Sequence, residues 1–370
     1  MTVGILALSV GIGAFVVNLA LMPGIIAIAR KKGWYDTRSK RKIHTTDIPR
    51  LGGVGLFVSF ALTAAVGLLG MSAIEGNSVF ARFAEYLPVL IGVSIMHVVG
   101  LVDDFKNLRA FRKLGIQLLA GAIVAISPYR LTGITIPFTE IAVRFGLFSY
   151  PLTIVWIVSL ANAFNLIDGV DGLAGGVAAI AGAFMLAIGV ITQQWALMVA
   201  SAALIGATVG FLVFNLPPAK IFMGDSGSLF LGSVLAVIPL LTRDGVQSAT
   251  NVVAILTLIL IPVFDTIAAI VRRVRDGQPI SQPDRKHLHH KLLDLNFGPW
   301  SVLAVGYGSC IALGSATVFW ITAEPRVGAT VLLAAWLLVL LGFIVLDRVQ
   351  LYRSQPHPGD ARTKGSRSHR

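Results

Sequence analysis

The sequence predicts an all-α polytopic membrane protein, and its composition, its apolar runs and the distribution of its basic residues all indicate this class. Hydrophobic residues make up 55% of the 370 residues and charged residues only 13%, whereas a soluble domain carries about 25% charged residues. The mean hydropathy is +0.80. Apolar runs of about 17 to 25 residues, the length that crosses a bilayer as a helix, recur along the chain.

Eleven such runs define the expected transmembrane helices. Charged residues directly follow the first run, and the third run ends just before Asp103. The fourth and fifth runs are short because polar residues lie at one end of each. Between the fourth and fifth, ITIPF at 134–138 alternates as a strand does, which predicts a short external hairpin. The spans are expected near 3–29, 53–71, 87–102, 114–127, 150–161, 177–191, 195–214, 228–242, 251–271, 301–322 and 329–346.

Residues 1–350 are expected to form a single transmembrane catalytic domain, and the basic tail at 351–370 is expected to be disordered. Cys310 is the only cysteine and lies in an apolar run, so neither an intrachain disulfide nor a thiolate metal site is expected. The net charge of +12 fits anionic lipid headgroups and membrane topology, so nucleic acid is not an expected partner.

The basic residues predict the orientation. Of the 30 lysines and arginines, only five fall in one set of alternate loops: Arg82, Arg130, Arg144, Arg243 and Arg326. The remainder fall in the other set, which the positive-inside rule places in the cytoplasm. The N-terminus is therefore predicted outside and the C-terminus in the cytoplasm.

We expect topology reporters to reproduce this division. A reporter fused after Lys113 or Lys291 should read cytoplasmic, and one fused after Thr139 or Gln247 should read external. Opposite readings for the loops that carry Asp104 and His289 would contradict the orientation.

Five polar clusters lie on the predicted cytoplasmic side. Ionisable groups this close to apolar spans are costly, so they mark a functional site by default. Because all five face one side, they form one candidate site. They are Asp103–Asp104, NAFNLIDGVDGLAGG at 162–176, Asn215, FMGDSGS at 222–228 and HLHH at 287–290.

In two of these clusters, the carboxylate side chains predict a site that binds an anion or a metal ion. Asp103 and Asp104 repel each other at a membrane boundary; either a divalent cation or salt bridges with the following basic residues would resolve this. In the second cluster, side chains recur every three residues, so one helical face or a tight loop is expected to present all four. These are Asn162, Asn165, Asp168 and Asp171.

The FMGDSGS and HLHH clusters leave alternatives open. Asp225 among glycines and serines is typical of a loop for a hard cation and phosphate. Phe222, as a lone aromatic residue, favours simple packing. The histidines are flanked by Arg285, Lys286 and Lys291, which suit an anion better than zinc, and no cysteine is at hand as a ligand. A solvated loop is the remaining interpretation.

Several motifs together resemble one family. RKIHTTDIPRLGG, DDFKN, NAFNLIDGVDGLAGG, NLPPAKIFMGDSGS, IPVFDT and PDRKHLHHKLLDLNF are similar, in this order, to motifs of the polyprenyl-phosphate N-acetylhexosamine-1-phosphate transferases, which include the phospho-MurNAc-pentapeptide transferases. The resemblance implies transfer of a sugar-1-phosphate from a UDP-sugar to undecaprenyl phosphate, with release of UMP. It also implies an enzyme of the bacterial inner membrane whose active site faces the cytoplasm. Membrane lipids are then expected partners, and a homodimer is compatible with the resemblance.

The resemblance also implies roles for individual residues. Asp225 and Asn165 match ligands of Mg²⁺, for which Mn²⁺ is a substitute, and Phe222 matches an aromatic residue that stacks on uracil, against the packing interpretation. The residues that match catalytic positions are Asp103, Asp104, Asp168, His287, His289 and His290. Those that match the nucleotide-sugar cleft are Asn162, Asp171 and Asn215. Asn107 departs from the family pattern, and no role is assigned to it.

The H-x-H-H spacing with basic neighbours resembles members that use UDP-GlcNAc more than those that use UDP-MurNAc-pentapeptide. The resemblance thus favours UDP-GlcNAc, as the first membrane step of an envelope polysaccharide pathway. Direct attack by the lipid phosphate is favoured over a covalent aspartyl-phosphate route. An ion-coupled transporter is the alternative from another class, but its ionisable groups would lie near the bilayer midplane. The DG-x2-AR spacing of CDP-alcohol phosphatidyltransferases is absent.

Overall fold

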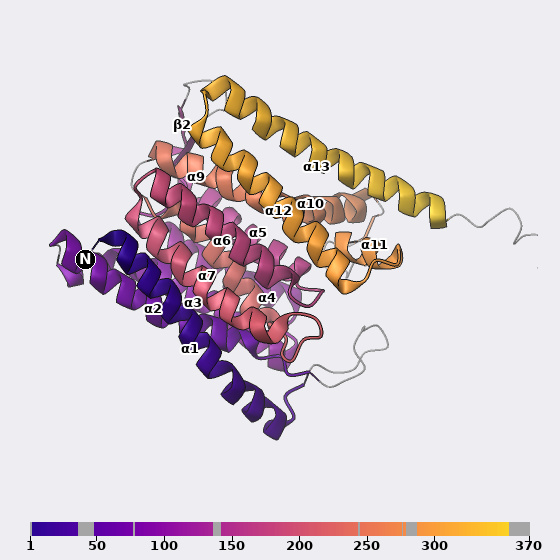
Figure 1. The fold of residues 1–370 in the computed structure, drawn as a ribbon, viewed down its shortest axis with the longest axis horizontal. Helices are drawn as coiled ribbons and strands as arrows, with labels where there is room; N and C mark the ends of the chain where they lie inside the picture. Colours follow the sequence, from indigo (N-terminus) through magenta and orange to yellow (C-terminus); the bar gives the residue numbers. More distant parts are fainter. Residues whose placement is uncertain are drawn as a thin grey trace, which may run out of the picture.

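The computed structural model describes residues 2–35, 48–76, 78–135, 142–242, 245–275, 277–278 and 287–354, which form a helical bundle with one small sheet (Figure 1). The helices are α1 (Val3–Lys32), α2 (Gly52–Glu75), α3 (Val79–Lys106), α4 (Ala110–Ala125), η1 (Gly146–Phe148), α5 (Ser149–Ile167), α6 (Leu173–Ile191), α7 (Trp195–Asn215), α8 (Gly224–Val237), η2 (Ile238–Leu240), α9 (Gly245–Leu258), α10 (Leu260–Arg275), α11 (Leu288–Asp294), α12 (Pro299–Thr322) and α13 (Pro325–Ser354).

The predicted fold class is confirmed, since every expected apolar run overlaps a helix. Among the described residues, eight helices are long and apolar enough to cross a membrane, and the bent pair α9 and α10 makes up to nine. The apolar helix at α8 and η2 is shorter, and α4 has 16 residues. The count of eleven spans and the orientation therefore stay predictions.

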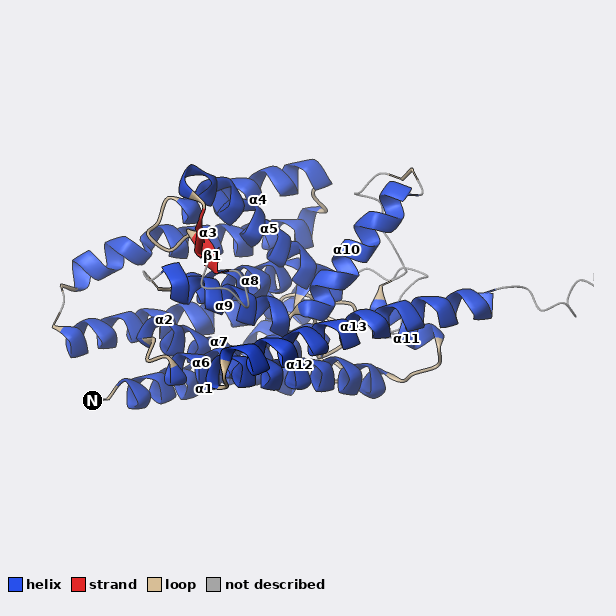
Figure 2. Cartoon of the chain, turned by 90° about the horizontal axis from the view of Figure 1, so that it is seen from above, coloured by secondary structure: helices blue, strands red, loops and turns tan. Residues whose placement is uncertain are grey.

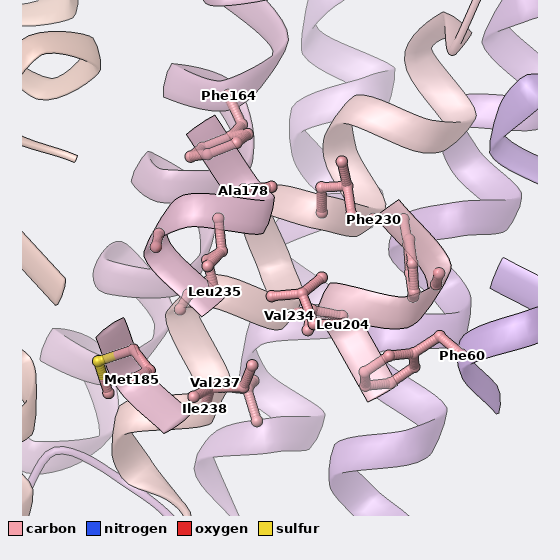
Figure 3. Close-up of a cluster of buried hydrophobic side chains, with 14 of the residues drawn as sticks. Phe60, Phe164, Ala178, Met185, Leu204, Phe230, Val234, Leu235, Val237 and Ile238 are labelled. Carbon is pink, nitrogen blue, oxygen red and sulfur yellow. The ribbon is translucent and has the colours of Figure 1, made fainter. Parts of the chain in front are cut away.

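Helix α8 lies at the centre of the bundle. Its side chains from Ser226 to Val237 are all buried. Figure 3 shows Phe230, Val234 and Leu235 surrounded by apolar side chains of other helices, including Phe60 of α2 and Phe164 of α5. A helix that is apolar on all sides belongs in a core. This burial fixes the position of the α8 N-terminus, which carries Asp225.

Small residues let the first helix approach the bundle closely. A Cβ atom built on Gly206 of α7 would lie only 2.0 Å from the carbonyl oxygen of Gly11 in α1. Membrane helices commonly approach closely through such small residues. Larger side chains at these positions would force α1 away from α7.

The ninth expected span is broken rather than continuous. Helices α9 and α10 meet at an angle of 75°, and α10 leans away from the bundle (Figure 2). Pro262 lacks the amide proton that would bond the carbonyl oxygen of Leu258, which accounts for the break. The Cys310 thiol of α12 donates to that carbonyl oxygen instead, at 3.3 Å.

The predicted hairpin is present in its described part, and its external location stays a prediction. Strands β1 (Gly133–Thr135) and β2 (Ala142–Arg144) pair antiparallel; residues 136–141 lie outside the described residues. At the other end of the chain, α13 continues to Ser354, so the expected tail boundary at residue 351 falls within this helix. Residues 355–370 lie outside the described residues.

Candidate active site

The polar clusters meet at one end of the bundle, where the C-terminal ends of α3 and α5 lie beside the N-terminal end of α8. Asp225 is the centre of this arrangement. Its Oδ1 accepts from Arg50 Nη2 at 3.1 Å, and its Oδ2 accepts from Asn165 Nδ2 at 3.2 Å and from Lys113. Lys113 also donates to Asp103 Oδ2 at 2.8 Å. The side chains of Asp103, Lys113 and Asp225 are 15 to 16% exposed, so the charges face one another in a largely water-excluded corner.

Asp104 has a different function from its neighbour, because it caps α8. Its two carboxylate oxygens accept the backbone N–H groups of Asp225 and Ser226, at 2.8 and 3.0 Å. A carboxylate at a helix N-terminus satisfies free amides and the helix dipole. Gly224, with φ +71°, lets the carboxylate approach, since a Cβ there would lie 2.6 Å from Asp104 Oδ2. Asp104 therefore fixes Asp225 in place.

Arg50 reaches the site through backbone pairing. The backbone N–H of Phe222 bonds the carbonyl oxygen of Pro49, and the N–H groups of Gly52 and Gly53 bond the carbonyls of Phe222 and Met223. This ladder joins residues 49–53 to the segment just before α8. It places the guanidinium of Arg50 between Asp104 and Asp225.

Phe222 lies on the same ladder. Its backbone bonds fix its position from both sides, while the residue as a whole is only partly buried and does not belong to the buried core. Both the packing interpretation and the stacking role of Phe222 therefore stay predictions.

Asn162 lies one helical turn before Asn165, but it contacts a different helix. Its Nδ2 donates to Gln117 Oε1 of α4 at 2.8 Å. Asn165 instead donates to Asp225 of α8. The regular spacing therefore does not present Asn162 and Asn165 to one partner; the first joins α4 to α5 and the second belongs to the charged cluster.

Asp171 and Asn215 connect the loop after α5 to the loop after α7. Asp171 Oδ2 accepts the N–H of Ala219 at 3.0 Å. Asn215 accepts the N–H of Gly172 at 2.9 Å and donates to the carbonyl oxygen of Ile221 at 2.8 Å. Both side chains are buried. In this structure they hold together the two loops that frame Asp225.

Asp168 ends α5 and lies in the field of the charged cluster. Burial, opposed by Arg50 and reinforced by Asp225, Asp104 and Asp171, raises the pKa of Asp168 to about 7. The carboxyl group thus exchanges its proton near neutral pH, which is the range in which a general acid or base is most effective.

We expect this shift to appear in the stability of the metal-free protein. The folded chain keeps the Asp168 proton up to about pH 7, whereas the ordinary pKa is 3.8. The stability contributed by the protonated form is therefore complete below about pH 3.8 and is lost as the pH rises through about 7. Relative to Asp168→Asn, the Tm of the wild type in EDTA should fall between pH 4 and 8. A Tm difference that does not change with pH would contradict the assignment.

The histidines lie on α11, which packs against the loop after α5. A Cβ atom on Gly169 would lie 2.4 Å from His289 Nε2, so glycine is required for this contact. The His289 and His290 rings have centroids 4.3 Å apart. Burial, with His290 and His287 adding to it, lowers the pKa of His289 to about 3. His289 is therefore neutral at physiological pH.

Several residues that complete the site were not among the predicted site residues. Arg50 lies 175 positions from Asp225 and Lys113 lies 112 positions from it. Arg50 belongs to the motif at 41–53, and Lys113 is one of the basic residues that follow the Asp103–Asp104 pair; these were the available signals. Asp265, which contacts His287, lies in IPVFDT.

The donor set fits a magnesium ion that binds with its substrate. Asp103 and Asp225 share Lys113, and the Asn165 amide adjoins Asp225. In the described part of the chain, no three His, Cys, Asp or Glu side chains are grouped as metal ligands. Mg²⁺ commonly binds through one or two carboxylates plus substrate phosphates, rather than in an all-protein cage. Asp225, Asp103 and Asn165 would supply oxygen ligands for that mode.

The apolar helices of the bundle are those of an integral membrane protein, and the comparisons with known proteins make it a transferase. Residues 86–243 match the model of glycosyl transferase family 4. A probable undecaprenyl-phosphate N-acetylglucosaminyl 1-phosphate transferase of Bacillus subtilis is 33% identical over 317 residues, which cover 83% of this chain and 86% of the relative. The chain belongs to glycosyl transferase family 4.

Two further relatives indicate the range of the family. A decaprenyl-phosphate N-acetylglucosaminephosphotransferase of Mycobacterium tuberculosis is 30% identical over 350 residues, covering 88% of this chain and 85% of the relative. A phospho-N-acetylmuramoyl-pentapeptide-transferase of Bacillus thuringiensis is 34% identical over 247 residues, covering 62% of this chain and 74% of the relative. The relatives named for N-acetylglucosamine therefore match a larger share of the chain.

Proposed function

We propose that this protein transfers GlcNAc-1-phosphate from UDP-GlcNAc to undecaprenyl phosphate, with release of UMP and formation of undecaprenyl-diphosphate-GlcNAc. The observation that carries the proposal is the charged cluster around Asp225, in which Arg50 and Lys113 meet Asp103 and Asp225 at one end of a membrane bundle. Two anionic phosphates must meet in this reaction, and such a cluster can offset their repulsion.

The chain's own residues divide the work of the reaction. Arg50 and Lys113 bind phosphate oxygens when substrates displace their carboxylate partners. Asp103, Asp225 and Asn165 would hold Mg²⁺, or Mn²⁺ in its place, and the ion would neutralise charge that develops on the phosphate oxygens. Asp104 caps α8, so orientation of the lipid phosphate falls to Asp103.

The reaction needs no strong base. The second pKa of a phosphate monoester is near 6, so undecaprenyl phosphate is largely dianionic at neutral pH. One of its oxygens attacks the β-phosphorus of UDP-GlcNAc, a new P–O bond forms, and the bond from the β-phosphorus to the bridging oxygen breaks. UMP leaves with that oxygen. Asp168, with its pKa raised to about 7, is positioned at the edge of the cluster to take up or return a proton.

The sugar assignment rests on the relatives named for N-acetylglucosamine and on the HLHH spacing. Purified protein given UDP-GlcNAc and UDP-MurNAc-pentapeptide in separate reactions, each with undecaprenyl phosphate, tests it. We expect lipid-linked product from UDP-GlcNAc. Turnover of UDP-MurNAc-pentapeptide alone would overturn the choice of sugar, and turnover of neither would overturn the proposed function.

The proposed uracil contact of Phe222 gives a separate prediction. If the ring stacks on the base, Phe222→Ala should weaken UDP-GlcNAc binding by about 1 to 3 kcal/mol, while Phe222→Trp retains much of it. The KM for undecaprenyl phosphate should barely change. A packing residue would instead cost about 3 to 5 kcal/mol of stability. A large fall in Tm with parallel loss toward both substrates would therefore sink the stacking role.

A further inference from the structure

The helix that carries the histidines is anchored by a buried carboxylate from another helix. Asp265 lies in α10, just beyond the break with α9, and is 2% exposed. Its Oδ1 accepts the backbone N–H of Leu288, the first residue of α11, at 3.0 Å. Its Oδ2 lies 3.0 Å from His287 Nδ1. One carboxylate therefore caps α11 and orients the histidine at its start.

The contact with Asp265 determines which nitrogen of His287 carries the proton. A carboxylate only accepts hydrogen bonds, so the facing Nδ1 must be protonated. In neutral His287, the Nε2 atom is then left as an acceptor. This is the general way in which a second group fixes a histidine tautomer.

A chain of contacts connects His287 to the edge of the charged cluster. The His287 and His289 rings are parallel to within 6°, with centroids 6.0 Å apart. His289 in turn touches Gly169, the residue after Asp168. A substitution at Asp265 would therefore affect the edge of the proposed reaction site through the rings of His287 and His289 and the loop at Gly169.

A second anchor holds the other side of α11 through a side-chain ion pair that does not involve the His287 ring. Lys291 is 2% exposed and pairs with Asp347 of α13. Breaking this pair loosens α11 but leaves the contact between Asp265 and His287 in place. The two anchors can therefore be separated by mutation.

We propose that Asp265 is a positioning residue for the transfer reaction: it holds His287 as the Nδ1–H tautomer and keeps His289 against the loop at Gly169. The proposal rests on the proposed function for its kinetic effect. The tautomer itself is a property of the protein alone.

Asp265→Asn tests the proposal. Asparagine keeps the size of the side chain, and its Oδ1 can still accept from Leu288. Its NH₂ group then faces His287 Nδ1, which must become the acceptor. We expect kcat to fall about 10- to 100-fold, by analogy with groups that orient metal-ligating histidines. The KM for UDP-GlcNAc and the Tm should change little.

A double-mutant cycle shows whether Asp265 acts through His287. In the His287→Ala background, Asp265→Asn should cause no further loss of kcat, because the coupled partner is gone. Asp347→Asn is the matched control, since it removes the other anchor of α11. It should lower the Tm without changing the His287 tautomer. Equal, additive losses from both asparagine variants would show that Asp265 acts only by holding α11, and would overturn the proposal.

A spectroscopic measurement decides the matter without any substrate. In protein labelled with ¹⁵N-histidine, the His287 resonances are assigned by their absence in His287→Ala. Wild-type His287 should show a protonated Nδ1, and Asp265→Asn a protonated Nε2. A wild-type Nε2–H tautomer would refute the inference even if the enzyme transfers GlcNAc-1-phosphate. Conversely, failure of the proposed donor would leave this result intact.

Discussion

Asp225→Asn should lower the rate of transfer by about 1,000-fold, which corresponds to about 4 kcal/mol of activation free energy. Asp225 contacts Arg50, Lys113 and Asn165 at once. Neutralising it removes a carboxylate ligand from the proposed Mg²⁺ site and takes the shared anionic partner from two partly buried cations. The measurement is kcat over a range of Mg²⁺ concentrations, with the Tm as a control for folding.

The dependence on Mg²⁺ distinguishes a ligand from a structural residue. The residual activity of a folded Asp225→Asn protein should no longer respond to added Mg²⁺. A folded variant that retains near wild-type turnover at low Mg²⁺ would contradict both the metal site and the central place of Asp225.

Lys113→Met is the second large expected effect, with a loss of about 100-fold in kcat/KM, or about 2.7 kcal/mol. Methionine keeps most of the length of the side chain but removes the charge that joins Asp103 to Asp225. The two carboxylates would then repel each other and the incoming phosphates. Lys113→Arg should recover part of the activity because it restores the charge.

Lys106→Met is the matched control for this prediction. Lys106 lies at the exposed end of α3, close to Asp103 in sequence, and its replacement should change the activity less than about twofold, as expected for an exposed surface position. Equal losses in Lys106→Met and Lys113→Met would mean that only general positive charge matters. That result would contradict the specific bridge.

The fold class could be predicted well from the sequence because the requirement for an apolar surface in the bilayer applies to each helix separately. A helix that crosses a bilayer must be apolar over its own length, and every predicted run overlaps a helix. The break between α9 and α10 was not predicted: the run at 251–271 is apolar enough overall to be taken as one span, and whether a proline such as Pro262 bends a helix depends on its neighbours. Here the Cys310 thiol satisfies the freed carbonyl of Leu258.

The candidate site could be predicted in part. Asp103, Asp104, Asn165 and Asp225 do meet, as expected of polar clusters on one side. Their division of labour could not be predicted, because it depends on partners far away in the sequence. Asp104 caps α8, a contact across 121 positions. Asn162, Asp171 and Asn215 stabilise helix and loop contacts that no local spacing reveals.

The fate of the β-phosphate of UDP-GlcNAc tests the central claim most directly. Purified protein is incubated with undecaprenyl phosphate and UDP-GlcNAc that carries ³²P in the β position, and the lipid and nucleotide products are separated. The proposed function predicts that the label enters the lipid and that one UMP is released for each labelled lipid. Release of labelled UDP, with an unlabelled glycolipid, would show sugar transfer without the phosphate and would contradict the account.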